Sequence, residues 1–421
     1  MAKLIIRGGR PLRGRVRVGG RKNSAVAVLP ATLLADGVST LENLPSIDDV
    51  RVYADILGGL GCDVQIATAA SGNGTITVNP AGFSPLAVPH DVTKRLRASY
   101  YLLGVLLARC GRAEVPLPGG CDIGLRPIDQ HLKGFRALGA DVVIEHGMVR
   151  ATAPALAGAS IYLDVVSVGA TINIMLAATL AEGTTVIENA AKEPHVVDLA
   201  NYLNAAGARV QGAGTDVIRI RGVERLNGCT HSIIPDEIEA ATYMIAAAAT
   251  RGDVLVENVI PKHLDPVVAK LHEAGADIEE EGDVLRLKMN GRPRAVNVKT
   301  LPYPGFPTDA QQPMTVLLSL AEGTSIVTES IWESRFKHVD ELKRMGTSIR
   351  VEGRTAIIEG VERLTGAPVR ATDLRAGAAL VVAALAAEGE TEITGIELVD
   401  RGYERVLEKL NGLGADVARE E

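Results

Sequence analysis

Cys121 stands in a loop whose composition favours chemistry over packing. The stretch from Pro118 to Asp129 reads PGGCDIGLRPID, so Pro and Gly residues flank the cysteine and disfavour a regular helix or strand. Arg126 follows five residues later, and a nearby guanidinium stabilises the thiolate form of a cysteine. The alternative is a small buried hydrophobic residue, which is the commonest role of a free cysteine. Because such a loop is a poor place for burial, we predict a reactive thiol on a surface loop.

Basic residues recur where apolar helices are expected to begin. Lys22, Arg97 and Arg375 lie at three such starts, and Arg126 and Arg401 are further candidates. The first turn of a helix presents free N–H groups and partial positive charge, so a cation there opposes the helix dipole. An anion should compensate for that cation. A cleft lined by helix N-termini and these residues would therefore bind phosphate or carboxylate.

Acidic and hydroxyl residues at the other helix starts have a simpler interpretation. Four of them are of types that commonly cap helices, namely Thr93, Ser167, Asp236 and Asp309. Asp236 is also followed three residues later by Glu239, which is the pattern of a capping box. For a single aspartate at such a position, a structural cap is the more frequent role.

Two short patterns recur along the chain with a period of roughly 70 residues. In the first, a helix ends at a glycine before a short β-like run, at Gly61, Gly139, Gly207, Gly275, Gly346 and Gly414. In the second, an apolar helix ends at a glycine that leads into a strand, at Gly37, Gly111, Gly183, Gly252, Gly323 and Gly389. Each glycine of the first pattern suits the residue after a helix, where φ is positive.

Six such units account for the whole chain, and each holds two helices and several short strands, so the predicted fold class is α/β. The helices of the second pattern are apolar on nearly every face, as in residues 101–108 and 378–385. A helix of this kind is surrounded by protein, whereas amphipathic partners such as residues 265–274 lie nearer solvent. Buried helices with strands outside them predict an inverted α/β barrel, with three units in each half.

The overall composition limits the classes of function. A chain of 421 residues suggests two domains, and 47% hydrophobic residues with 23% charged residues are typical of a globular protein. Four cysteines without a C-x-x-C pair indicate neither a zinc site nor a disulfide framework and fit a reducing cytoplasm: Cys62, Cys110, Cys121 and Cys229. A net charge of −7 argues against a general nucleic-acid binder. The sequence predicts neither a signal peptide nor a membrane span.

Several motifs together resemble those of the UDP-N-acetylglucosamine 1-carboxyvinyltransferases, a family of enolpyruvyl transferases, from end to end of the chain. They are Lys22-Asn23, the Cys121 loop with Arg126, Ser167-Val-Gly169, Phe306-Pro-Thr-Asp309, Asp373-Leu-Arg375 and Asp400-Arg-Gly-Tyr403. The resemblance implies transfer of enolpyruvyl from phosphoenolpyruvate to the 3′-hydroxyl of UDP-N-acetylglucosamine, with release of phosphate, as the first committed step of peptidoglycan synthesis. It also implies a two-domain inside-out α/β barrel, which agrees with the repeats. We expect the domains to comprise residues 1–21 with 236–421, and residues 22–235 with the Cys121 loop.

The resemblance implies roles at the phosphoenolpyruvate site. Cys121 would donate a proton to the methylene carbon, could add covalently to the substrate and would be the target of fosfomycin. Asp309 would lie at the attacking hydroxyl as a general base or an orienting group. The remaining residues would hold the phosphate (Lys22, Arg126, Arg401), hold the carboxylate (Arg335, Arg375) or lie beside them (Asn23). Neither a cofactor nor a metal is implied.

The resemblance also implies a lining for the nucleotide-sugar pocket. Its residues would be Arg97, Arg126, Pro127, Ile128, Asp129, Gln130, His131, Val165, Val166, Ser167, Val168, Gly169 and Ile331, with Glu193 and Asp236 in the surrounding polar site. Val165 stands where some members of the family carry Lys. A side-chain contact to the diphosphate is therefore in question at that position, although the backbone donors around it remain.

The residue types suit the implied reaction, which needs an acid at the methylene carbon, stabilisation of developing charge and a base for the hydroxyl. Asp309 at a helix start should have a depressed pKa and be a weak base, so we expect it to act chiefly by orientation. Closure of two domains would exclude water from the intermediate.

Two alternatives remain open. The sister enzymes that transfer enolpyruvyl to shikimate 3-phosphate share the architecture, but the Cys121 loop favours the nucleotide sugar. A ring-forming DNA clamp also uses repeated α/β units on an acidic chain. A clamp leaves the Cys121 loop and the cations at helix starts unexplained, and its DNA binding would depend steeply on salt.

Overall fold

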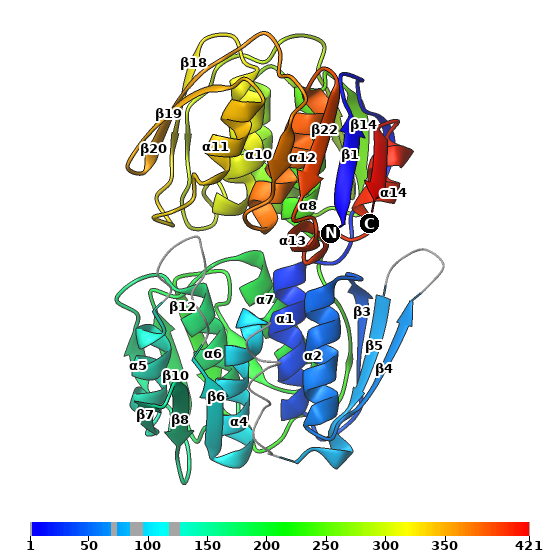
Figure 1. The fold of residues 1–421 in the computed structure, drawn as a ribbon. Helices are drawn as coiled ribbons and strands as arrows, with labels where there is room; N and C mark the ends of the chain where they lie inside the picture. Colours follow the sequence, from blue (N-terminus) through cyan, green and yellow to red (C-terminus); the bar gives the residue numbers. More distant parts are fainter. Residues whose placement is uncertain (1, 69–73, 85–95, 118–126, 421) are drawn as a thin grey trace. The chain divides into compact units, whose positions relative to one another are not determined.

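The computed structural model describes residues 2–68, 74–84, 96–117 and 127–420, so Cys121 and Arg126 lie outside the described residues. The described residues form two compact units (Figure 1). Unit I contains residues 2–19 and 235–420, and unit II contains the described residues between 20 and 234. The chain passes from one unit to the other at 19–20 and again at 234–235.

Helices and short strands alternate along unit I. Its helices are α8 (Glu237–Ala249), α9 (Asp265–Glu273), α10 (Thr308–Ser319), α11 (His338–Arg344), α12 (Leu374–Ala386), α13 (Glu397–Asp400) and α14 (Val406–Gly412), with a 3-10 turn at Pro261–His263. Its strands are β1 (Lys3–Arg7), β2 (Arg13–Arg17), β14 (Asp253–Glu257), β15 (Asp277–Glu281), β16 (Val284–Lys288), β17 (Val298–Lys299), β18 (Thr324–Thr328), β19 (Ser348–Glu352), β20 (Thr355–Glu359), β21 (Pro368–Arg370), β22 (Glu390–Thr394) and β23 (Asp416–Glu420).

Unit II has the same alternation. Its helices are α1 (Lys22–Ala31), α2 (Asp48–Gly59), α4 (Leu102–Cys110), α5 (Asp129–Ala137), α6 (Val168–Ala178) and α7 (Pro194–Ala205), with 3-10 turns at Thr32–Leu34, Pro80–Gly82 and Arg97–Tyr101. Its strands are β3 (Ser39–Leu44), β4 (Asp63–Thr68), β5 (Gly74–Asn79), β6 (Arg112–Pro116), β7 (Asp141–Glu145), β8 (Met148–Thr152), β9 (Ser160–Tyr162), β10 (Thr184–Glu188), β11 (Arg209–Gln211), β12 (Val217–Arg221) and β13 (Thr230–Ser232).

The strands of both units follow one recurring arrangement. In unit I, β21 runs parallel to β22, β22 antiparallel to β1, and β1 antiparallel to β23. In unit II, β9, β10, β12 and β11 repeat this order with the same directions. Five of the sheets formed by the described residues have four strands, and one has three, β6, β8 and β7. The prediction of an α/β fold is confirmed, and the recurrence agrees with the predicted repeat.

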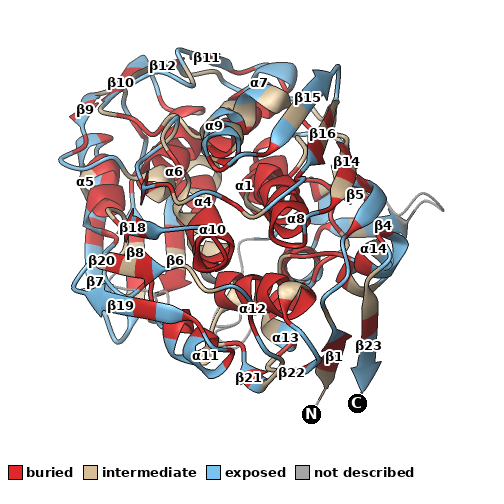
Figure 2. Ribbon diagram, turned by 90° about the horizontal axis from the view of Figure 1, so that it is seen from above, coloured by how far each residue is buried: buried red, intermediate tan, exposed pale blue. Residues whose placement is uncertain are grey.

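Three helices lie in the interior of each unit. In unit I, α8, α10 and α12 pack on one another, and nearly all of their residues are buried (Figure 2). The corresponding helices of unit II are α1, α4 and α6. Because these helices have no polar face, they are stable only where protein surrounds them. The strands supply that cover, since alternate residues of β14, such as Val254 and Val256, point into the core.

Small residues allow the interior helices to approach closely. A Cβ atom on Gly104 of α4 would lie 2.3 Å from the backbone oxygen of Asn173 in α6. Any larger residue at this position would push α4 and α6 apart, and the resulting gaps would cost packing energy in both helices.

The glycines of the first sequence pattern all have the predicted positive φ, at Gly61, Gly139, Gly207, Gly275, Gly346 and Gly414. The second pattern departs from a simple cap after α8, where Arg251 takes the positive φ of 55° in place of Gly252. A Cβ atom on Gly252 would lie 2.2 Å from the carbonyl oxygen of Leu12. Glycine is therefore required at 252 by close packing against the chain leading to β2, and not by its own φ.

Candidate active site

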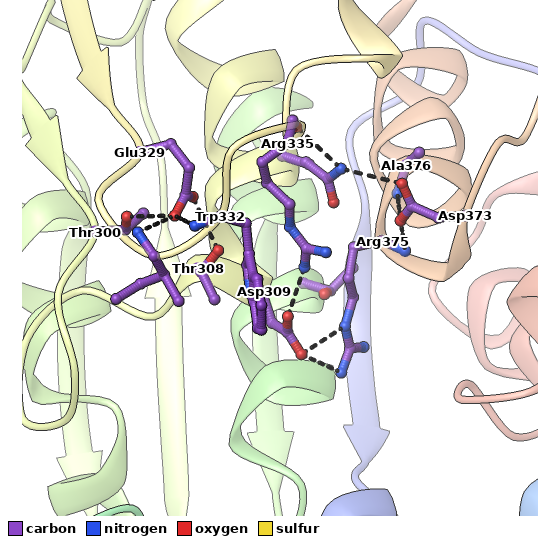
Figure 3. Close-up of polar contacts among 12 residues, drawn as sticks. Thr300, Thr308, Asp309, Glu329, Trp332, Arg335, Asp373, Arg375 and Ala376 are labelled. Atoms are coloured by element: carbon purple, nitrogen blue, oxygen red, sulfur yellow. Dashed lines mark hydrogen bonds and ion pairs between the residues drawn. The ribbon is translucent and has the colours of Figure 1, made fainter. Parts of the chain in front are cut away.

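Asp309 lies in the first turn of α10 and pairs with two arginines from other segments of unit I (Figure 3). Arg335 donates from Nη2 to Oδ1 at 2.6 Å, and Arg375 donates from Nε to Oδ2 at 3.1 Å. Arg375 Nη2 forms an ion pair with the same oxygen at 3.1 Å. The side chains of Arg335 and Arg375 are 3% and 5% exposed, whereas that of Asp309 is 28% exposed. Three residues predicted from the sequence to share a site are therefore in direct contact.

The interpretation of Asp309 as an ordinary helix cap is wrong. Helix α10 begins at Thr308, and its N-cap is Pro307, which makes no side-chain capping hydrogen bond. The Asp309 carboxylate turns instead towards the two guanidinium groups, because charge-assisted hydrogen bonds to arginine are stronger than a bond to a neutral N–H group.

Asp236 does cap its helix. Its Oδ1 accepts hydrogen bonds from the N–H groups of Ile238 and Glu239 at 2.9 and 3.1 Å. The predicted capping box is only half formed, because Glu239 Oε2 accepts from the Gly19 N–H at 2.9 Å and the Asp236 N–H donates to the Gly19 carbonyl. The start of α8 is therefore joined to Gly19, the last residue of unit I before the chain enters unit II.

Arg375 remains charged although it is buried. Burial by itself lowers the pKa of the guanidinium, but Tyr403, Asp309 and Asp236 raise it, and the net result lies above the ordinary value. The guanidinium carbon lies 5.4 Å from the centre of the Tyr403 ring, within reach of a cation–π interaction. The Tyr403 hydroxyl shares a hydrogen bond of 2.8 Å with the hydroxyl of Thr242. Tyr403 therefore contacts the Arg375 guanidinium, and Thr242 of α8 fixes the Tyr403 hydroxyl.

Both arginines retain unused donors. Arg335 Nε and Arg375 Nη1 are buried and have no hydrogen-bond partner among the described residues. An unsatisfied buried polar group costs about 1–3 kcal/mol, and more when it is charged. An anion with oxygen acceptors beside these atoms would remove that cost. The pair therefore has the donors to bind an anion in addition to, or in place of, the Asp309 carboxylate.

The start of α12 sets the position of Arg375. Asp373 is the N-cap, and its Oδ1 accepts from the N–H groups of Arg375 and Ala376 at 2.8 and 3.0 Å. Gln312 of α10 donates weakly both to Asp373 Oδ2 at 3.5 Å and to the Arg335 carbonyl at 3.4 Å. One side chain of α10 therefore touches both segments that carry the arginines.

His338 follows Arg335 closely and is fully buried at the start of α11. Burial, opposed by Asp373 and assisted by Arg335, lowers the pKa of its imidazole from 6.5 to about 4. Its ring stacks on Phe336 with 6.4 Å between ring centres. His338 is therefore a neutral packing residue beneath the arginine segment at neutral pH.

Glu329 is a residue of this site that the sequence patterns did not single out. It is 1% exposed and accepts four hydrogen bonds (Figure 3). The donors are Thr300 Oγ1 at 2.9 Å, Thr308 Oγ1 at 2.9 Å, Ile331 N–H at 2.8 Å and Trp332 N–H at 3.1 Å. An acidic residue also ends the similar strands β10 and β14, as Glu188 and Glu257. An acidic residue at the end of a strand therefore does not by itself mark Glu329 as a site residue in the sequence.

Two further predicted residues lie in the same part of unit I. Ile331 is half-buried and donates its N–H to Glu329. Arg401 is the C-cap residue of α13 and is half-buried, two residues before the Tyr403 ring that supports Arg375.

In unit II, α1 begins at the predicted residue Lys22 and has no acidic residue in its first turn. Lys22 Nζ pairs with Asp49 Oδ2 of α2 at 2.7 Å, and the two side chains are 14% and 6% exposed. The anion expected to offset a cation at this helix start is thus Asp49 in this structure. Asn23 follows, and it is half-buried.

Close to Lys22 in the sequence, Ser24 takes part in a structural network with Asp198 and His231. Ser24 donates to Asp198 Oδ2, and His231 Nε2 bonds Asp198 Oδ1 at 2.9 Å. In a catalytic triad the histidine lies between the serine and the acid, whereas here the acid lies between the other two. The network therefore joins α1 to α7 and β13 and does not activate Ser24.

The predicted residues of α5 contact the segment that leads into α6. Gln130 Oε1 accepts from the Asp164 N–H at 2.9 Å, and Gln130 Nε2 donates to Asp164 Oδ2 at 3.1 Å and to Asp129 Oδ2 at 2.8 Å. Val165 and Val166 follow and are 59% and 41% exposed. Apolar side chains exposed beside a helix N-terminus are available for a ligand. Ser167 caps that helix by accepting from the Ala170 N–H at 3.3 Å.

Asn173 of α6 orients His131. Its Oδ1 accepts from the Gly104 N–H at 2.8 Å, so its Nδ2 must donate to the Tyr100 carbonyl at 2.9 Å and to His131 Nδ1 at 3.1 Å. A neutral His131 ring then carries its proton on Nε2. A Cβ atom on Gly169 would lie 2.6 Å from the Tyr100 hydroxyl and 3.0 Å from His131 Nε2. The turn that begins at Arg97, α5 and the start of α6 therefore meet at Gly169.

The remaining predicted residues of unit II are at the starts of helices. Ile128 is the N-cap of α5, and the exposed Pro127 precedes it. Val168 is the first residue of α6. Glu193 is the N-cap of α7, with Pro194 as the first helical residue. Of Arg97 only the backbone position is described, as the first residue of its 3-10 turn.

The three described cysteines do not have the properties of a reactive thiol. Burial raises the pKa of Cys62 to about 11 and also raises the pKa of Cys110 and Cys229. A nucleophilic cysteine needs a lowered pKa and access to substrate. None of the cysteines in the described part of the chain therefore competes with Cys121 for that role.

Among the residues that the structure describes, no group of three or more His, Cys, Asp or Glu side chains is arranged to hold a metal ion. Within the same residues, no helix has the length and apolar character needed to span a bilayer.

Comparisons with known proteins identify the family. The family described as EPSP synthase (3-phosphoshikimate 1-carboxyvinyltransferase) matches residues 6–410. The chain is 60% identical to UDP-N-acetylglucosamine 1-carboxyvinyltransferase 3 of Symbiobacterium thermophilum, covering 100% of this chain and 98% of that one. It is 59% identical to UDP-N-acetylglucosamine 1-carboxyvinyltransferase of Clostridium botulinum, covering 100% of both chains.

Solved structures extend the likeness to the fold. The enolpyruvyl transferase NikO from Streptomyces tendae superimposes with a TM-score of 0.90 at 27% identity, over 100% of this chain and 99% of that one. EPSP synthase from Acinetobacter baumannii superimposes with a TM-score of 0.75 at 22% identity over 100% of both chains, which is evidence for the fold alone. The resemblance inferred from the motifs is confirmed, and this chain belongs to the UDP-N-acetylglucosamine 1-carboxyvinyltransferase family of enolpyruvyl transferases.

Proposed function

We propose that this protein transfers the enolpyruvyl group of phosphoenolpyruvate to the 3′-hydroxyl of UDP-N-acetylglucosamine and releases phosphate. The names of full-length relatives at 59–60% identity support both the donor chemistry and the acceptor. The reaction is the first committed step of peptidoglycan synthesis, so the protein serves cell wall biogenesis and, through it, cell shape, the cell cycle and cell division. We place it in the cytoplasm, which fits four cysteines without a disulfide framework.

The observation that carries the proposal is the Asp309 carboxylate held between Arg335 and Arg375, at 2.6 and 3.1 Å. Arginine matches a carboxylate because its planar fork can donate two parallel hydrogen bonds. Phosphoenolpyruvate brings such a carboxylate. Arg335 Nε and Arg375 Nη1, which have no partner among the described residues, supply donors for it. Asp309 would then be released to meet the acceptor hydroxyl.

The proposed chemistry is an addition followed by an elimination. In the addition, the 3′-hydroxyl oxygen bonds to C2 of phosphoenolpyruvate, the hydroxyl proton leaves by way of Asp309, and the methylene carbon takes a proton from the Cys121 thiol. In the elimination, the bond from C2 to the phosphate oxygen breaks, and the methyl group returns a proton to the Cys121 thiolate, which restores the double bond. Cations lower the barrier by stabilising the departing phosphate.

The other residues receive roles one by one. Lys22, Arg126 and Arg401 hold the phosphate of phosphoenolpyruvate, with Asn23 beside Lys22. The nucleotide sugar binds to Ile331 in unit I and, in unit II, to Arg97, to the segment from Arg126 to His131 and to the segment from Val165 to Gly169. Glu193 and Asp236 complete the polar surroundings. The contact of Gln130 with the backbone before Val165, and that of His131 with Gly169, support a common role for the two segments of unit II.

Shikimate 3-phosphate is the second candidate acceptor, because the matching family is described by that activity. The two candidates are separated by one assay. Purified protein is mixed with phosphoenolpyruvate and either acceptor, and phosphate release is followed. Release with UDP-N-acetylglucosamine alone is the expected result. Release only with shikimate 3-phosphate would refute the acceptor assignment, and release with neither would refute the activity.

Cys121 is tested by its covalent chemistry. Intact-mass spectra of the wild-type protein are expected to contain an adduct with phosphoenolpyruvate and, in a separate sample, one with the covalent inhibitor fosfomycin. Cys121→Ser should remove both adducts, while Cys110→Ser and Cys229→Ser, which alter thiols of raised pKa, should keep them. An adduct that survives Cys121→Ser would assign the chemistry to another residue.

A further inference from the structure

Glu329 is a buried carboxylate that no lysine or arginine neutralises among the described residues. Its four hydrogen bonds all come from neutral groups, two threonine hydroxyls and two backbone N–H groups (Figure 3). Three of these donors bond Oε1 and Thr308 bonds Oε2, so both carboxylate oxygens accept hydrogen bonds from the protein. A buried polar group satisfied to this degree is rigid, because movement of any one partner leaves a donor or an acceptor unpaired.

The four donors come from three separate segments of unit I. Thr300 follows β17, Thr308 is the first residue of α10, and Ile331 and Trp332 begin the segment that leads to Arg335. Thr308 directly precedes Asp309, and Asp309 contacts Arg335 at 2.6 Å. These contacts form a closed path. Glu329 bonds Thr308, which adjoins Asp309, and Asp309 bonds Arg335. The chain then leads back from Arg335 through Trp332 to Glu329.

We propose that Glu329 is a positioning residue for enolpyruvyl transfer. Through Thr308 it holds Asp309 in contact with Arg335, and through their backbone N–H groups it fixes Ile331 and Trp332. The proposal rests on the function proposed above. Glu329 is 1% exposed and contacts the reacting groups only through its neighbours. Its effect is geometric, and a misplacement of about 1 Å at a reacting group costs roughly 100-fold in rate.

Two threonines provide a matched comparison. Thr308→Val and Thr300→Val each delete one hydroxyl that donates to Glu329 at 2.9 Å, and the two substitutions are isosteric. Thr308 adjoins Asp309, whereas Thr300 lies on the strand side and also accepts from the Ser330 N–H at 2.8 Å. If Glu329 positions Asp309, Thr308→Val should lower kcat by about tenfold, and Thr300→Val should change it by less than about threefold, although Thr300→Val loses two hydrogen bonds and Thr308→Val loses one. Equal loss of kcat in the two variants would refute the proposal.

Substitution of Glu329 itself separates hydrogen bonding from charge. Glu329→Ala removes all four acceptor contacts and should lower kcat by about 100-fold. Glu329→Gln keeps an oxygen for Thr300, Ile331 and Trp332, and its amide can donate to the Thr308 hydroxyl, so it should restore most of the rate lost in Glu329→Ala. If Glu329→Gln is as inactive as Glu329→Ala, the charge or proton of Glu329 is used directly and the positioning role is wrong.

Trp332 supplies a readout that does not depend on catalysis. It is the only tryptophan of the chain, and its backbone N–H donates to Glu329. Glu329→Ala should shift its fluorescence emission at a temperature where circular dichroism remains that of the wild type, while Glu329→Gln should leave the emission unchanged. An unshifted spectrum in Glu329→Ala would contradict the positioning of this segment. If the wild-type protein releases no phosphate, the proposed function fails, and the fluorescence comparison still decides whether Glu329 orders the segment.

Discussion

At the scale of single residues, the contacts of Asp309 with Arg335 and Arg375 in unit I follow from their opposite charges. Arg335 and Arg375 are almost fully buried, and the carboxylate between them belongs to a partly exposed residue, Asp309. Two buried cations can share one internal carboxylate only as long as no better anion is present. If Arg335 and Arg375 hold the substrate carboxylate, as proposed above, the Asp309 carboxylate competes with it for the same pair of arginines.

Asp309→Asn should consequently have opposite effects on binding and turnover. Removal of the internal anion frees Arg335 and Arg375, so phosphoenolpyruvate should bind several-fold more tightly by isothermal titration calorimetry in the absence of the nucleotide sugar. Loss of the group at the acceptor hydroxyl should lower kcat by roughly 100-fold or more. Asp340→Asn is the control, because it removes the same charge from a carboxylate that is 88% exposed. Weaker binding of phosphoenolpyruvate to Asp309→Asn would contradict the competition.

His338 gives unit I a dependence of stability on pH. Its folded pKa of about 4 lies below the ordinary value of 6.5, so between these values the unfolded chain takes up a proton that the folded chain does not. The free energy of unfolding should therefore fall as the pH is lowered through this window, by an amount on the order of 3 kcal/mol.

Denaturant unfolding at pH 7, 5.5 and 4.5 tests this expectation. His338→Phe, which can keep the stacking on Phe336, should lose less stability between pH 7 and 4.5 than the wild type does. His146→Asn, which changes an exposed histidine, should behave as the wild type. Identical pH dependence in His338→Phe and the wild type would assign the acid sensitivity to other groups.

At the scale of elements, the starts of the interior helices carry several of the predicted site residues. Asp309 lies in the first turn of α10, Arg375 in that of α12, Lys22 in that of α1 and Gly169 in that of α6. The helix bodies are mostly apolar and buried, and polar residues within them, such as Gln312 and Asn173, bond other parts of the protein. The same arrangement aims free backbone N–H groups at a bound anion.

Gly169, at the start of α6, has no space for a Cβ atom. Gly169→Ala would place a methyl group 2.6 Å from the Tyr100 hydroxyl and 3.0 Å from His131 Nε2, so α5 or the Tyr100 turn must shift. We expect KM for UDP-N-acetylglucosamine to rise by about tenfold or more, with little change in phosphoenolpyruvate binding. Gly58→Ala in α2, where a Cβ atom meets nothing within 4 Å, should leave both unchanged and stabilise the helix by about 0.5–1 kcal/mol. An unchanged KM in Gly169→Ala would show that this contact does not shape the pocket.

At the scale of the whole molecule, each unit has its own hydrophobic core. One core contains residues between Ala25 and Ile233, and the other contains residues between Leu4 and Val18 and between Ala240 and Val417. The cores share no residue. We therefore expect a cavity in one unit to lower the local stability of that unit first.

Leu318→Ala in α10 and Leu176→Ala in α6 form a matched pair, because both leucines are fully buried in an interior helix. Each should cost about 2–5 kcal/mol in its own unit. Hydrogen exchange followed by mass spectrometry should reveal faster exchange in unit I for the first variant and in unit II for the second. Equal acceleration across both units in either variant would mean that the cores unfold together.

Much of the fold could be predicted from the sequence, because its causes are local. A glycine that takes a positive φ directly after a helix ends that helix, and an apolar helix must be buried whatever surrounds it. The recurrence of both signals predicted the α/β repeat. Lys22 and Arg375 could also be named, because cations are unusual at helix starts, whereas the role of Asp309 was implied only by the resemblance of the motifs.

Only the tertiary structure decided which of these residues meet. Asp309 had the sequence features of a cap, but contacts with residues 26 and 66 positions away gave it two arginines instead. Glu329 resembled other acids at strand ends until the fold surrounded it with four donors. The sequence by itself determined where helices begin and which helices are buried, since propensity and hydrophobicity act over a few residues. Partners for buried charges depend on segments distant in the chain, and only three-dimensional packing brings those together.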